Sequence, residues 1–207
     1  MAAAKTAPDA RDNTLRHAVT SVLYTIVSVI ALGLIYPLAI WAIGTVLFHH
    51  QAEGSLIVDK SGRVIGSELV GQSWTSPRYF HGRPSAAGKG YDPTATGGTN
   101  LGPTSKKLID ATRAAIADLK KANPDATGPV PMDLVTSSAS GIDPDVSPEG
   151  AYYQAARVAK ARGLSLDAMR ALIERNVVPR QFGILGEPRV NVLQLNRALD
   201  AQGAASK

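Results

Sequence analysis

The sequence predicts an α+β protein in which one N-terminal transmembrane helix is followed by a single extracytoplasmic domain of mixed helices and strands. Residues 18–48 contain no Asp, Glu, Lys, Arg or His. Beyond them, helix-capping residues alternate with short apolar runs, a pattern that is typical of mixed helices and strands. We therefore divide the 207 residues into a cytoplasmic tail (1–17), a transmembrane helix (18–48) and an extracytoplasmic domain (49–207).

The uncharged run 18–48 is long enough to cross a membrane, because a hydrocarbon core about 30 Å thick requires about 20 apolar residues. A cleavable signal peptide is the alternative. Its apolar region usually covers about 7–15 residues and ends in small residues. This run is longer and leads into Phe48, His49 and His50. We interpret it as an uncleaved anchor.

Basic residues flank the anchor on one side only. Lys5, Arg11 and Arg16 precede it, whereas the next Lys or Arg is Lys60. Flanks rich in Lys and Arg remain in the cytoplasm. The sequence therefore predicts a single-pass protein with a cytoplasmic N-terminus and an extracytoplasmic C-terminal domain.

Two features within the anchor bear on its packing. Pro37 lacks a backbone donor and predicts a kink. Ser21, Thr25 and Ser28 share one helical face, and small polar faces allow membrane helices to approach closely. In the alternative, these hydroxyls bond to carbonyls of their own helix. We expect a helix-packing face here and leave both interpretations open.

Composition narrows the possible partners and sites. The chain has 22 Lys and Arg against 17 Asp and Glu, and these charges are scattered without an aromatic-interleaved basic stripe, so nucleic acid is not an expected partner. Membrane lipid is an expected partner through the anchor. There is no Cys, and the His spacing fits no metal site. We expect no metal ligands.

The first part of the domain predicts a hairpin and then a long loop. Residues 55–59 and 63–69 are expected strands, joined by a turn over 60–62 that contains a Gly. Residues 71–103 are rich in Gly, Pro, Ser and Thr and show no regular period. Loops of this length are uncommon in compact domains and are often functional. We interpret this loop as the working surface.

The C-terminal half predicts several helices with clear start and stop signals. At helix starts, Ser and Asn side chains accept hydrogen bonds from the free backbone N–H groups, and Pro has no N–H to satisfy. Gly163 is suited to a helix end, where the backbone often adopts positive φ. The expected elements are a helix over 105–122, a short strand over 132–136, helices over 147–162 and 165–175, turn and strand over 177–187, and a last helix over 191–199.

Two functions of other classes remain possible from the residues alone. A membrane-anchored extracytoplasmic hydrolase would use His81 as base, a serine from 137–140 as nucleophile, and Asp143 or Asp145 to orient the His. These serines do not form the G-x-S-x-G pattern of a nucleophile elbow. An envelope-binding module is the other alternative.

A set of segments in a fixed order resembles a known family. The segments are 54–57, 71–72, 79–85, 97–101, 134–143, 157–162, 190–192 and 195–196. Together with the single span, this set resembles the KdpC family, the small C subunit of the bacterial high-affinity potassium-transporting P-type ATPase. The resemblance extends from the span to about Leu199.

The resemblance implies an accessory subunit without its own active site, in the bacterial cytoplasmic (inner) membrane. Its implied partners are a channel-like potassium-binding subunit, an ATP-hydrolysing P-type subunit and a small single-span subunit. These partners would handle ATP and K⁺, so we expect no catalytic or cofactor-binding residues here. The family is described as a catalytic chaperone that raises ATP affinity. Since ATP is cytoplasmic and the domain is predicted outside, we expect such an effect to be allosteric.

The long loop also supplies candidate docking residues for these partners. Aromatic residues and Arg are enriched at binding hot spots. In the alternative, Tyr79 and Phe80 fill the domain core. The candidates for partner docking are Tyr79, Phe80, His81, Arg83 and Asn100.

Overall fold

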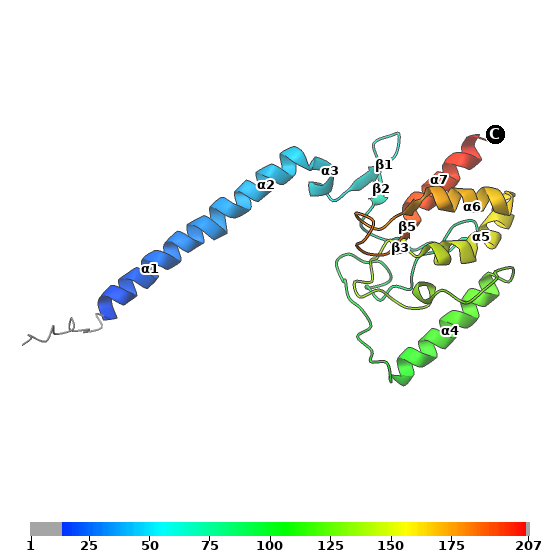
Figure 1. Ribbon diagram of the computed structural model, residues 1–207, viewed down its shortest axis with the longest axis horizontal. Coiled ribbons are helices and arrows are strands. Elements are labelled where there is room, and N and C mark those ends of the chain that lie inside the picture. The colour runs from blue at the N-terminus through cyan, green and yellow to red at the C-terminus, as the bar shows by residue number, and fades with distance from the viewer. Residues whose placement is uncertain (1–13, 206–207) are drawn as a thin grey trace, which may run out of the picture. The chain divides into compact units, whose positions relative to one another are not determined.

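The computed structural model describes residues 14–205 and divides into two compact units, Met1–Glu53 and Gly54–Lys207 (Figure 1). The expected tail therefore lies mostly outside the described residues. The first unit contains the helices α1 (Thr14–Ile30), η1 (Ala31–Ile35), α2 (Tyr36–Leu47) and α3 (His49–Ala52).

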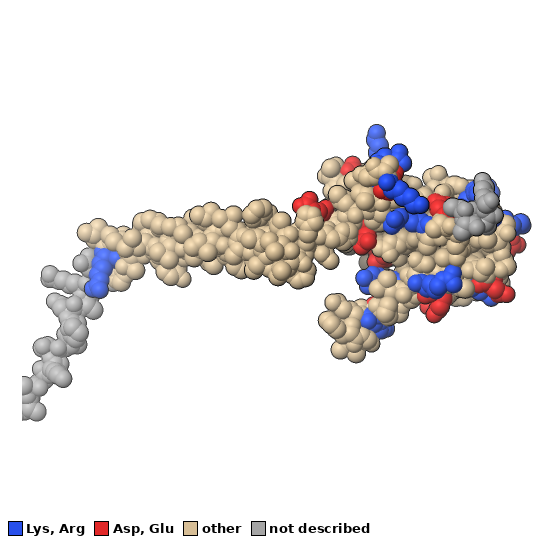
Figure 2. Space-filling view, turned by 90° about the horizontal axis from the view of Figure 1, so that it is seen from above, with Lys and Arg blue, Asp and Glu red and all other residues tan. Residues whose placement is uncertain are grey.

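The segment Thr14–Leu47 forms one helix of 34 residues that is long and apolar enough to cross a membrane. None of its most apolar window is buried by the protein itself. Beyond the first turn, which carries Arg16, the helix is uncharged along its length (Figure 2). Apolar side chains with no protein partner over this length are what a bilayer would cover. The helix is thus a candidate membrane span.

The helix changes its geometry just before Pro37. Residues Ala31–Ile35 form a π-helical turn, and the Tyr36 N–H donates to the Ala31 carbonyl five residues back. Pro37 cannot donate to the carbonyl of Gly33, so local widening of the helix near this residue is physically reasonable. Where the sequence predicts a kink, the structure has a π-helical turn within a helix that continues.

The face formed by Ser21, Thr25 and Ser28 is only partly occupied by internal bonds. The Thr25 hydroxyl donates to the Ser21 carbonyl at 2.8 Å. Thr20 and Thr45 make the same bond to the carbonyls four residues before them. The back-bonding alternative therefore holds for Thr25.

The second unit begins with the predicted hairpin. Strand β1 (Leu56–Val58) pairs antiparallel with β2 (Val64–Ser67). The Asp59 carboxylate closes the turn by accepting from the Ser61 amide at 2.8 Å and the Ser61 hydroxyl at 2.6 Å. These bonds, that of the Ser61 hydroxyl first, lower the pKa of Asp59. Gly62 supplies the positive φ of 81°.

The loop 71–103 carries no helix or strand, as predicted, and is nevertheless held firmly. The Gly71 N–H donates to the Ile142 carbonyl at 2.9 Å, and the Gly97 N–H donates to the Ser140 carbonyl at 2.8 Å. These backbone hydrogen bonds join the loop to the segment 138–143. The two irregular segments therefore form one packed layer.

Helix α4 (Lys106–Ala122) follows and ends at Asn123, as the sequence predicts. The predicted strand over 132–136 is wrong, because the structure has a 3₁₀ turn, η2 (Met132–Leu134). The Asp133 carboxylate accepts from the Ser147 amide at 2.6 Å and from the Ser147 hydroxyl at 3.1 Å. These bonds tie the turn to the start of the next helix, and no strand is paired with it.

A small antiparallel sheet has the order β3-β5-β4, formed by β3 (Asp145–Val146), β5 (Arg189–Asn191) and β4 (Val177–Val178). Strands of two or three residues are too short for a period-2 pattern. For that reason β3 and β5 are missed by sequence reasoning, although the turn and strand expected over 177–187 include β4.

Helices α5 (Pro148–Arg162), α6 (Leu166–Arg175) and α7 (Val192–Ala205) begin at the predicted caps. The hydroxyls of Ser147 and Ser165 accept hydrogen bonds from backbone amides at 2.9 and 3.1 Å, and the side-chain Oδ1 of Asn191 accepts one at 3.1 Å. Helix α5 ends at Gly163 with φ 68°. The core lies among these three helices and the sheet. Its largest fully buried apolar side chains are Phe80, Met169, Ile173, Leu195, Leu199, Val158 and Val190.

Candidate functional site

The candidate segment 79–83 is bound along helices α5 and α7 by two buried side-chain amides. Asn196 on α7 accepts the Phe80 N–H at 2.9 Å and donates to the Phe80 carbonyl at 3.0 Å. Gln154 on α5 accepts the His81 N–H at 2.8 Å and donates to the His81 carbonyl at 3.0 Å. Each amide thus satisfies both backbone groups of one residue, as a neighbouring strand would.

These bonds decide the position of Phe80. Its side chain is completely buried in the helical core. Phe80 therefore fills the core, which is the alternative that the sequence leaves open, and it offers no surface to a partner.

Tyr79, by contrast, stays half-buried at the surface within a cluster of four side chains. The Arg162 guanidinium lies 4.6 Å from the centre of its ring, a cation–π distance, and the Trp74 ring lies 4.7 Å away. The Tyr79 hydroxyl donates to Asp200 at 3.1 Å, and Arg162 pairs with the same carboxylate at 2.7 Å. We call these four residues the Tyr79 cluster.

Arg157 connects the loop to the rest of the domain. Its guanidinium donates to the carbonyls of Pro77 and Tyr79 at 2.7 and 3.0 Å, and to the amide oxygens of Asn123 and Gln154 at 2.9 and 2.8 Å. Burial lowers the pKa of Arg157 to about 10. A planar fork with four acceptors holds three parts of the chain in one geometry.

Arg83 is largely engaged inside the domain. It pairs with Asp143 at 2.9 Å, and its carbonyl accepts the Tyr91 hydroxyl at 2.6 Å. Burial, with the charge of Asp143, raises the pKa of Tyr91 to about 12. Arg83 and Trp74 line a cavity of about 250 Å³, and the Arg83 Nε and Trp74 Nε1 groups are buried without an acceptor from the described residues.

Asn100 remains exposed, with φ 50°, in the left-handed region that Asn tolerates better than most residues. Of the five predicted docking residues, Asn100 is thus the most open. The structure brings Tyr79, Phe80 and His81 together on α5 and α7, and it directs Arg83 toward Asp143 on the opposite segment.

The groups required for a hydrolase do not meet. A ring nitrogen of His81 lies 2.9 Å from the Ser76 carbonyl, and burial lowers the pKa of His81. The Ser138 hydroxyl accepts the Gly141 N–H at 2.9 Å. Asp145 pairs with Arg189 at 2.9 Å. Within residues 14–205, no hydrogen bond joins His81 to a serine of 137–140, and no group of three metal-ligating side chains occurs.

The segment 137–141 instead packs beneath the loop. Gly141 has φ 72°, and a Cβ there would lie 2.7 Å from the Ala87 amide nitrogen. Its carbonyl accepts the Ser85 hydroxyl at 2.6 Å. The glycine is therefore required by both backbone conformation and close approach. The run of small residues 137–140 directly before Gly141 is the sequence signal that could have suggested this crossing.

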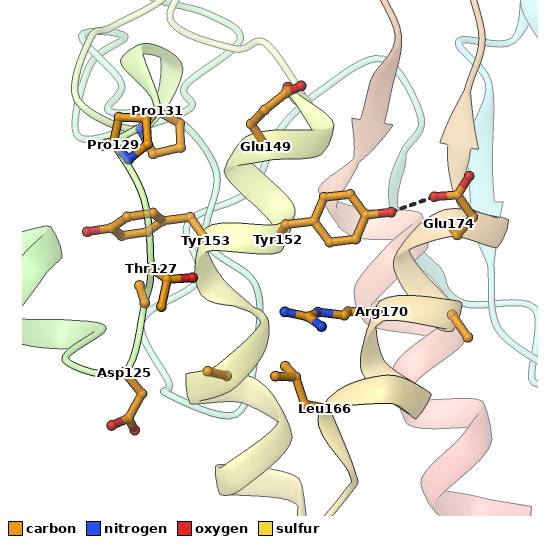
Figure 3. Close-up of a pocket in the computed structure, with 13 residues that line it drawn as sticks. Asp125, Thr127, Pro129, Pro131, Glu149, Tyr152, Tyr153, Leu166, Arg170 and Glu174 are labelled. Atoms are coloured by element: carbon orange, nitrogen blue, oxygen red, sulfur yellow. Dashed lines mark hydrogen bonds between the residues drawn. The ribbon is translucent and has the colours of Figure 1, made fainter.

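Sequence reasoning misses a groove of about 700 Å³ that lies between α5, α6 and the linker 125–131 (Figure 3). Arg170 points into it, and the Tyr152 hydroxyl donates to Glu174 on its far side. That bond, with burial, raises the pKa of Tyr152 to about 12. The walls are mostly apolar, from Pro, Ala and Leu residues, and offer no paired nucleophile and base.

Comparisons with known proteins identify the family of this chain. The family model described as "KdpC: K+-transporting ATPase, c chain" matches residues 18–201. A "Potassium-transporting ATPase KdpC subunit" of Myxococcus xanthus is 53% identical over 181 residues, covering 87% of this chain and 86% of that protein. The subunit of the same description from Acidobacterium capsulatum is 53% identical over 186 residues, covering 90% and 98%.

A third relative of the same description, from Rhodospirillum rubrum, is 55% identical over 168 residues, covering 81% of this chain and 86% of that protein. The match to the family model includes the apolar helix as well as the domain. The hydrolase and envelope-binding alternatives are therefore not favoured. The chain therefore belongs to the KdpC family, the c chain of the K⁺-transporting ATPase, and is an accessory subunit of that pump rather than its catalytic subunit.

Proposed function

We propose that the helix Thr14–Leu47 anchors this chain in the bacterial cytoplasmic membrane with its N-terminus inside, and that the domain assembles with the pump on the outer side. The observation that carries the proposal is an apolar helix of 34 residues, uncharged beyond its first turn, in the same chain as a domain with its own core. The bias of basic residues toward the N-terminal flank supports this orientation.

In this proposal the domain covers the outer mouth of a channel-like potassium-binding subunit, and the anchor packs against partner helices in the membrane. The remaining partners are the ATP-hydrolysing P-type subunit and a small single-span subunit. The face with Ser21, Thr25 and Ser28 is the candidate helix-packing surface. Asn100, which is exposed, and Tyr79, which is half-buried within the Tyr79 cluster, are the accessible candidates in the docking loop.

The chain has no catalytic role of its own in this scheme. ATP and K⁺ are handled by the partner subunits. An outer domain is separated from cytoplasmic ATP by about 30 Å of hydrocarbon. Any rise in the ATP affinity of the pump subunit is therefore an allosteric coupling, typically about 1–3 kcal/mol.

Sidedness and assembly test this proposal together. Protease added to intact spheroplasts should remove the region beyond Phe48, and the full chain should co-purify from membranes with three polypeptides and K⁺-stimulated ATPase activity. A domain that is protected in spheroplasts but digested after permeabilisation would refute the orientation. Purification of the chain without any of the other subunits would refute the assembly role.

A further inference from the structure

In the connection between β4 and β5, all of residues 178–187 are exposed. Three large apolar side chains lie near its tip: Phe182 is 83% exposed, Ile184 75% and Leu185 54%. Single exposed hydrophobic residues are ordinary, whereas three within four positions form a contiguous patch of the kind that marks an interaction site. We call residues 181–185 the apolar tip.

The apolar tip is a defined structure. The amides of Gln181 and Leu185 each donate to the other's carbonyl at 2.9 Å, and the Ile184 N–H donates to the Gln181 carbonyl at 3.2 Å. Phe182 adopts φ 54°, a conformation that is uncommon for a bulky residue. A strained backbone that presents an aromatic side chain to solvent is an observation that points toward function.

The charges around the tip are matched. Arg180 pairs with Glu187 across the base of the loop, and the neighbouring Arg189 pairs with Asp145 at 2.9 Å. Segments that bind anionic lipid surfaces carry Lys and Arg in excess. The apolar tip carries no charge, and its base is neutral. Charge complementarity therefore favours an uncharged apolar pocket on a protein over an anionic bilayer surface.

Two further exposed apolar side chains lie in a depression next to the loop. Leu69, which follows β2, is 59% exposed, and it lines one depression together with Val178. In Figure 1 the loop lies at the end of the domain that carries β1 and β2. Asn191 on β5 donates to the Glu68 carbonyl at 2.9 Å, which fixes this neighbourhood. The tip thus stands beside two further apolar side chains, Leu69 and Val178, and above ion pairs that neutralise the charges at its base.

We infer that Phe182, Ile184 and Leu185 form a docking tip that inserts into an apolar, uncharged pocket on another subunit of the pump. This inference rests on the proposed assembly role and names its contact. A tip that is already hydrogen-bonded loses little conformational freedom on binding. An aromatic anchor filling a pocket is the usual form of a binding hot spot.

The test replaces two tip residues in the full chain, expressed with the other pump subunits. Phe182→Asn and Ile184→Asn together remove the anchors, and Asn tolerates the left-handed backbone at position 182. Met132→Gln is the matched control, because Met132 is 72% exposed in η2, outside the tip. We expect the double variant to weaken retention of the other subunits on the tagged chain by about 100-fold, and the control to leave it unchanged.

A photo-crosslinking amino acid in place of Phe182 identifies the occupant directly. An adduct with a polypeptide of the purified complex supports the inference, whereas an adduct with lipid alone, or none, overturns it. Unchanged retention of the double variant also overturns it. If the unsubstituted chain does not co-purify with any pump subunit, the proposed function itself fails. If the unsubstituted chain assembles with the pump but the tip substitutions have no effect on retention, the docking tip is refuted and the proposed function stands.

Discussion

Replacing Asn196 by Leu should destabilise the domain, because it removes the hydrogen bonds that hold the candidate loop 71–103 on helix α7. The side chain is completely buried and forms both backbone bonds of Phe80, at 2.9 and 3.0 Å. Leu has a similar volume but satisfies neither group. Each buried backbone group left without a partner costs about 1–3 kcal/mol, so we expect the domain to lose about 2–6 kcal/mol. Domains of this kind have about 5–15 kcal/mol in total.

The measurement is urea unfolding of the full-length chain in detergent, with hydrogen exchange at the Phe80 and His81 amides as a local readout. Gln194→Leu is the control, because it lies on the same helix and its side chain makes no hydrogen bond among the described residues. A loss below about 0.5 kcal/mol for Asn196→Leu, or equal losses for both variants, would refute the argument that these two bonds hold the loop.

Three further predictions follow from the same packing. Arg157→Lys should destabilise the domain and release the loop to proteolysis, because an ammonium cannot reach the four acceptors of the guanidinium; unchanged protease resistance would contradict this. Gly141→Ala should reduce folded yield, because its Cβ would meet the Ala87 amide at 2.7 Å and its φ is 72°; a normal melting temperature would exclude this clash. Burial is the main cause of the lowered pKa of His81 in the folded domain. As the pH falls, the unfolded chain therefore binds a proton at this residue before the folded chain does. Stability should therefore fall as the pH drops below about 6.5, and His81→Gln should flatten that slope in pH-dependent unfolding.

Local sequence signals predict most of the helices and the first hairpin. A cap is a bond between residues two or three positions apart, so Ser147, Ser165 and Asn191 mark their helices without any knowledge of the fold. The turn at Gly62 is local in the same way. The sheet β3-β5-β4 is not predicted as a sheet, because its pairing joins residues far apart in the chain through strands of two or three residues.

The candidate site shows the same division. The length and composition of the loop 71–103 indicate an irregular segment, but not which of its aromatic residues face inward. Phe80 is buried because the side chain of Asn196, 116 positions later, forms hydrogen bonds with its backbone. Phe182 is the converse case. The sequence around Phe182 predicts a turn and a strand, where an apolar side chain can be either buried or exposed. Only the fold shows that this side chain is exposed.

Several segments that carry the family resemblance serve the architecture of the loop. Arg157 and Asn196 bind its backbone from two helices, and Gly141 allows it to cross a second irregular segment closely. A loop fixed on both sides in this way is a preformed surface, so binding a partner through it costs little conformational entropy. The same argument applies to the apolar tip. In the proposed assembly role, an accessory subunit gains from two preformed surfaces, since such surfaces hold the partners in one geometry at little entropic cost.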